Sequence, residues 1–77
     1  MKIQVNKNQQ EINFKKHVWS VIEIAKQKAE IGIERFYYPI PRNQGFSHWE
    51  LMERVEMKTE ESVYGDIRDG QIRFTIR

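Results

Sequence analysis

Apolar and polar positions alternate at the start of the chain and then change period. In KIQVN, residues 2–6, Ile3 and Val5 share one face, which predicts a short strand followed by the polar turn NKNQQ. From Asn13 onward, the apolar residues recur at helical spacing and form one stripe: Phe14, Val18, Val21, Ile22, Ala25 and Ala29. This spacing predicts a helix over residues 14–30, with Asn13 as its cap and Gly32 after its end. Trp19 lies beside the stripe or outside it.

The next apolar segment, IERFYY, is rich in residues that favour strands. Alternation over residues 33–38 places Ile33, Arg35 and Tyr37 on one side and Glu34, Phe36 and Tyr38 on the other. Because Pro39 and Pro41 lack the N–H group that a central strand must donate, we expect an edge strand here.

The segment WELMERVEM fits either an alternating strand or a helix. Its beginning favours the helix, because Ser47 and Glu50 have the spacing of a capping box and Phe46 with Leu51 the spacing of a hydrophobic staple. Glu50 and Arg54 also have the i,i+4 spacing of a helical ion pair. We therefore predict a helix over residues 48–58.

The C-terminal segment predicts a β-hairpin. Asp69 and Gly70 suit a two-residue type I′ turn, in which both residues have positive φ. This turn pairs Arg68 with Gln71, Ile67 with Ile72, Asp66 with Arg73 and Gly65 with Phe74. One face is then apolar (Val63, Gly65, Ile67, Ile72, Phe74, Ile76) and the other polar (Tyr64, Asp66, Arg68, Gln71, Arg73, Thr75, Arg77). Gly65 leaves room for the Phe74 ring.

Together these elements predict one α+β domain over residues 1–77. Its order would be βαβαββ, with two helices on one face of a mostly antiparallel sheet and a C-terminal hairpin. A chain this short buries only about 60% of the surface that it exposes when unfolded, so its core must be thin.

The amino-acid composition excludes several kinds of site and therefore several classes of function. The chain has no cysteine, which excludes disulfides and zinc sites built on cysteine, and its net charge is only +2. No phosphate-binding glycine loop, signal peptide or membrane-spanning run is recognisable, so we expect a cytoplasmic protein without cofactor or metal. The abundance of Ile, Asn and Lys suggests an AT-rich genome such as that of a phage or mobile element.

The two histidines, His17 and His48, are the first candidates for chemistry. Their spacing is not that of a metal site, and nothing in the sequence places them together. Structural roles explain both, and we predict no catalytic residue. A ribonuclease-like activity around either histidine is a third interpretation.

The segment RFYYPIPRNQGFSHW, residues 35–49, contains five of the nine aromatic residues. A thin domain cannot enclose all of them. We expect Phe36, Phe46 and Trp49 to face inward, with Tyr37, Tyr38, Arg42 and Trp19 at an exposed patch. The first hypothesis is a non-enzymatic module that binds another protein, or a second copy of itself, through six residues: Trp19, Arg35, Tyr37, Tyr38, Arg42 and Trp49.

The alternative is a small nucleic-acid-binding domain. The polar face of the hairpin would contact phosphates through Arg68, Arg73 and Arg77 and stack a base on Tyr64, with help from Lys15 and Lys16. The structural interpretation of the same residues is a solvated sheet face on which Asp66 neutralises Arg73.

Overall fold

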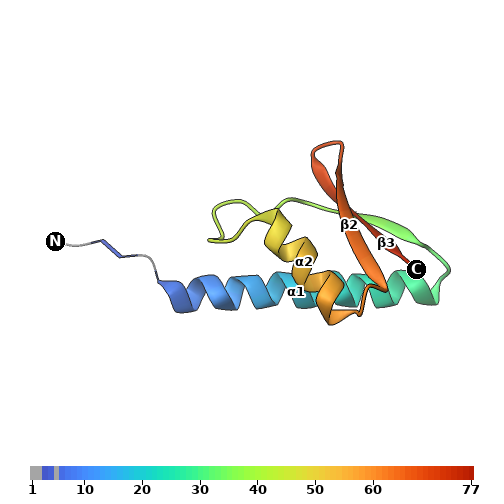
Figure 1. Ribbon diagram of the computed structural model, residues 1–77, viewed down its shortest axis with the longest axis horizontal. Helices are drawn as coiled ribbons and strands as arrows, with labels where there is room; N and C mark the ends of the chain where they lie inside the picture. The colour runs from blue at the N-terminus through green and yellow to red at the C-terminus, as the bar shows by residue number, and fades with distance from the viewer. Residues whose placement is uncertain (1–2, 5) are drawn as a thin grey trace.

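The computed structural model describes residues 3–4 and 6–77. Along this range the chain forms helix α1 (Lys7–Glu30), strand β1 (Arg35–Tyr38), helix α2 (His48–Lys58) and the hairpin strands β2 (Val63–Arg68) and β3 (Gln71–Ile76) (Figure 1). The strands form one antiparallel sheet in the order β1-β3-β2. The protein therefore has a small α+β fold, as predicted.

The predicted N-terminal strand is absent from the described part of its segment. Ile3, Gln4 and Asn6 have no strand structure, and Ile3 is 92% exposed, whereas Lys2 and Val5 lie outside the described residues. Asn6 instead caps α1, because its Oδ1 accepts a hydrogen bond from the Gln9 N–H at 3.0 Å. The described order is αβαββ, so the βαβαββ prediction is not confirmed.

Helix α1 begins at Lys7 rather than at residue 14, and the predicted NKNQQ turn belongs mostly to the helix. The early start follows from the Asn6 cap, which satisfies an N–H group that the first turn leaves without a partner. Its first turns extend beyond the other elements (Figure 1).

The other end of α1 agrees with the prediction. Gly32 has φ +77°, its N–H donates to the Ala29 carbonyl at 3.1 Å, and the Ile33 N–H donates to the Lys28 carbonyl at 2.9 Å. This pair of bonds is a Schellman motif, which turns the chain out of the helix toward β1.

Strand β1 is an edge strand with the predicted alternation. It pairs with β3 alone, and Phe36 lies opposite Phe74. Phe36 is buried, while the neighbouring Tyr37 is 51% exposed. The prolines that follow the strand end it at Tyr38.

Helix α2 spans the predicted residues, which excludes the strand alternative. The capping box is complete: Ser47 Oγ accepts from the Glu50 N–H, and a Glu50 carboxylate oxygen accepts from the Ser47 N–H, both at 3.2 Å. The predicted ion pair between Glu50 and Arg54, both within the described range, does not form. Glu50 is engaged by the cap, and the Arg54 guanidinium lies 5.3 Å from the centre of the Phe14 ring.

The hairpin forms in the predicted register, with Gly65 opposite Phe74 and Asp66 opposite Arg73. Asp69 and Gly70 both have positive φ, +52° and +73°, as the type I′ turn requires. A Cβ on Gly65 would lie 3.0 Å from Met52 Cγ and 3.1 Å from the Phe74 ring, so a larger residue fits only if one of these side chains shifts. Alternation and turn chemistry were sufficient to define this element.

A single apolar core joins both helices to the sheet. Its members come from α1, α2 and all three strands: Val18, Val21, Ile22, Ala25, Phe36, Leu51, Met52, Val55, Val63, Ile72 and Phe74. Ala29, predicted on the buried stripe, is exposed because the core ends before the last turn of α1. Phe74 is fully buried, and its ring stacks on that of Phe36 with 5.5 Å between centres.

The loop over residues 39–47 is held against α1 by aromatic packing. The Phe46 ring meets Phe14 and His17 edge-on, with ring centres 5.0 and 5.6 Å apart. Gly45, with φ +86°, approaches α1 so closely that a Cβ there would lie 2.4 Å from Gln10 Cγ. The inward position predicted for Phe46 is confirmed, since it is half-buried against the core.

Candidate binding surfaces

The structure does not gather the predicted protein-binding residues into one patch. Trp19 lies on α1, Trp49 in the first turn of α2 and Arg42 in the loop after β1. Arg35 and Tyr37 are on the side of β1 that alternates with buried Phe36. These residues therefore belong to separate surfaces.

Tyr38 faces inward, contrary to the prediction of an exposed patch. It is half-buried, and its hydroxyl lies 2.7 Å from His17 Nδ1. Burial raises the pKa of the Tyr38 hydroxyl, and burial together with the charge of Lys16 lowers the pKa of His17. His17 thus has a structural contact that explains its position.

The prediction that Trp49 faces inward is wrong. Its side chain is 62% exposed and lies beside His48, with ring centres 5.0 Å apart. The core side of α2 is already filled by Leu51, Met52 and Val55. Trp19 is 57% exposed, as predicted, so the chain leaves both tryptophans at its surface.

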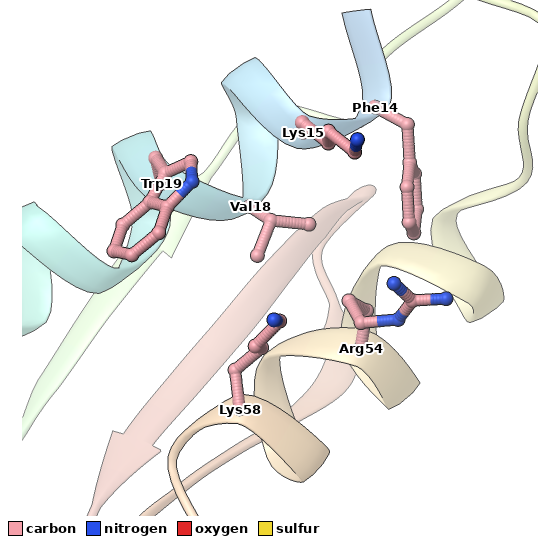
Figure 2. A pocket seen from close by; sticks show the side chains of 6 residues that line it. All are labelled: Phe14, Lys15, Val18, Trp19, Arg54 and Lys58. Atoms are coloured by element: carbon pink, nitrogen blue, oxygen red, sulfur yellow. The ribbon is translucent and has the colours of Figure 1, made fainter. Parts of the chain in front are cut away.

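A groove follows α1, first beside α2 and then beside the turn after α2 and the strand ends at Val63 and Ile76, and Trp19 lines both parts. Two adjoining hollows make it up, of about 260 and 410 Å³, and both are lined by Trp19 and Lys58. Figure 2 shows the first hollow, in which Phe14, Lys15 and Trp19 extend from α1 and Arg54 and Lys58 from α2. The second has an apolar lining that includes Ile22, Ala25, Ala29, Val63 and Ile76. We call the two together the interhelical groove.

The interhelical groove has a positive rim. Its lining includes four cationic side chains, Lys15, Lys26, Arg54 and Lys58, and within the described chain no Asp or Glu lines either hollow. Glu50 and Glu53 line a neighbouring hollow that shares Phe14 and Arg54 with the first. Lys15 and Lys26 form exposed ion pairs with Glu11 and Glu23 on the same helix, and such pairs contribute little. An apolar floor with a cationic rim suits a partner that is apolar and acidic.

The second surface is the side of the sheet opposite the core, here called the outer face. Its side chains alternate with the buried positions of the strands: Arg35, Tyr37, Tyr64, Asp66, Arg68, Gln71, Arg73 and Thr75. Arg77 joins them, because its guanidinium lies 4.6 Å from the centre of the Tyr64 ring. The outer face unites two residues of the predicted protein-binding set with four of the nucleic-acid set.

Because β1 and β2 both pair with β3, residues from the two predicted sets lie on the same face of the sheet. One row across the sheet contains Arg35, Thr75 and Tyr64, and the next contains Tyr37, Arg73 and Asp66. Asp66 is the one carboxylate of the outer face and accepts two hydrogen bonds from the Arg73 guanidinium, at 3.1 and 2.8 Å. These hydrogen bonds hold the pKa of Asp66 below its usual value. The predicted neutralisation of Arg73 is confirmed.

Lys15 and Lys16, the remaining residues of the nucleic-acid set, lie on α1 rather than on the sheet. Lys15 lines the interhelical groove instead. Arg54 and Lys58 were not recognised as a pair from the sequence, although two cations four residues apart on a predicted helix must share one face.

Other kinds of site find no support in the described residues. There, no group of three or more His, Cys, Asp or Glu side chains could hold a metal ion, and neither helix has a run apolar and long enough to cross a membrane. The chain matches no protein-family model, and no curated protein or solved structure is significantly similar to it.

Proposed function

We propose that this protein is a non-enzymatic module that binds another protein through the interhelical groove. The single observation that carries the proposal is the half-exposed Trp19, which stands between two hollows with an apolar lining and a cationic rim. Tryptophan and arginine are enriched among residues that dominate binding energy, and the first hollow is lined by both Trp19 and Arg54, which lie on opposite sides of Val18 in Figure 2.

The chemistry of the groove supports one kind of partner, a protein segment that is both apolar and acidic. Apolar side chains would enter the hollow lined by Ile22, Ala25 and Val63, and carboxylates beside them would meet Lys58 and Arg54. An amphipathic helix with acidic flanks presents this pattern, and docking of such a helix between two helices is a recurrent mode of peptide recognition. The role of Trp19 retains part of the sequence-based hypothesis. The other five residues of the predicted set line neither hollow and leave the contact set: Arg35, Tyr37, Tyr38, Arg42 and Trp49.

A labelled helical peptide with leucines along one face and glutamates beside them is the appropriate probe. Fluorescence anisotropy should show that this peptide binds and that a peptide with lysines in place of the glutamates does not. The double variant Arg54→Gln/Lys58→Gln should weaken binding about ten-fold, equivalent to about 1.4 kcal/mol. The control variant Lys16→Gln/Arg42→Gln removes the same charge outside the groove and should bind like the wild type.

Two outcomes would refute the proposal: equal binding of the acidic and basic peptides, or equal weakening by the two double variants. Sedimentation of the protein without peptide, which measures its mass in solution, shows whether a second copy is the partner. In that case the wild type has a mass that rises with concentration, and Trp19→Ala remains a monomer.

A further inference from the structure

We propose that the outer face of the sheet binds single-stranded nucleic acid. The inference is independent of the interhelical groove, because no residue of the outer face lines either hollow. It rests on a juxtaposition that the sequence did not reveal: β1 pairs with β3 and so places Arg35 and Tyr37 beside Tyr64, Arg73 and the other arginines of the hairpin.

Charge favours an anionic ligand. The outer face has four arginines and one carboxylate, and this carboxylate is held by Arg73 through two hydrogen bonds. Arg73 is therefore fixed in place at the centre of the sheet, while Arg35 is exposed at one edge and Arg68 at the other. Arg68 donates only one long hydrogen bond to Asp66, from Nε at 3.4 Å, so its other nitrogens can still contact phosphate. With Arg35 and with Arg77 near Tyr64, three guanidinium groups are available for phosphates.

Two tyrosine rings on the outer face could stack the bases of such a ligand. Tyr37 is 51% exposed, and the Tyr64 ring is covered on one side by the Arg77 guanidinium. From the spacing of ideal strands, the two tyrosines are about 12 Å apart, with Arg73 between them. An aromatic ring and an arginine plane are both platforms on which an unpaired base stacks. A duplex hides its bases, so the rings favour single strands.

Anisotropy with labelled oligo-uridine and oligo-thymidine of about twelve nucleotides tests the proposal, with a duplex of equal length as comparison. The two single strands also distinguish RNA from DNA. We expect weak binding to single strands that decreases between about 50 and 200 mM salt, with a logarithmic slope near −2 for three arginines. Arg35→Gln should reduce the steepness by about 0.7, whereas Arg54→Gln, in the groove, should leave it unchanged.

Substitutions of Tyr37 separate stacking from charge. Tyr37→Ala should lower the affinity at least about five-fold, and Tyr37→Phe, which keeps the ring, should restore it. Absence of binding to both single strands at about 50 mM salt would overturn the proposal. So would equal affinity for the duplex, or equal effects of Arg35→Gln and Arg54→Gln, since either result would indicate attraction to overall charge.

Discussion

The Tyr38 hydroxyl lies 2.7 Å from His17 Nδ1 and joins the end of β1 to the middle of α1. A neutral Nδ1 accepts a hydrogen bond from the Tyr38 hydroxyl, and a protonated Nδ1 donates one to the hydroxyl oxygen, so the contact itself forms in either state. The ring is also packed between Tyr38 and Phe46, where a charge is poorly solvated. Burial of the ring, rather than the hydrogen bond, therefore favours neutral His17.

The burial of His17 predicts a dependence of stability on pH. Burial lowers the pKa of His17 from 6.5 in the folded protein, so the unfolded chain takes up a proton first as the pH falls. The stabilisation is complete above about pH 6.5, and decreases below that value until the pH passes the folded pKa. Urea unfolding between about pH 8 and pH 5 should show this loss in the wild type and a smaller one in His17→Gln. An identical loss in both proteins would show that His17 is not responsible.

Neighbouring tyrosines of β1 should differ in their contribution to stability. Tyr38 packs against Phe74 and His17, so Tyr38→Ala should cost about 2 kcal/mol, less than a fully buried aromatic side chain. Tyr37 is half exposed on the outer face, and Tyr37→Ala should change the free energy of unfolding by less than about 0.5 kcal/mol. Chemical denaturation measures both. Equal costs would mean that the outer face is not open to solvent.

Two glycines with positive φ form a matched pair. Gly32→Ala meets no atom within 4 Å and should cost only the backbone strain, about 1 kcal/mol. Gly45→Ala adds a collision with the Gln10 side chain and should cost more. In a Gln10→Ala background, the additional cost of Gly45→Ala over Gly32→Ala should disappear. If the excess persists there in thermal unfolding, the loop does not rest on α1 as described.

Elements whose signals are local could be predicted from the sequence. The Asp69-Gly70 turn, the capping box of Ser47 and the glycine after α1 each depend on residues that are close along the chain. Alternation then defined which side of each strand faces the core. The hairpin part of the outer face was predicted as one surface, because its residues are close together in the sequence.

Features that depend on tertiary packing were missed. Nothing local shows that β1 pairs with β3, so Arg35 and Tyr37 were assigned to a different surface from Arg73. Trp49 was predicted inward on aromatic character alone, although Leu51, Met52 and Val55 already fill the core side of α2. Asn6 and Asn13 are equally good caps by residue type, and the helix begins at the earlier one.

The most direct test of protein binding by the interhelical groove compares the two tryptophans in one titration. Indole N–H resonances of Trp19 and Trp49 are followed by NMR as the acidic, leucine-bearing peptide is added. Both side chains are more than half exposed, and only Trp19 lines the groove. We predict that the Trp19 resonance shifts to saturation while that of Trp49 stays in place. A shift of Trp49 alone, or equal small shifts of both, would contradict docking in the groove.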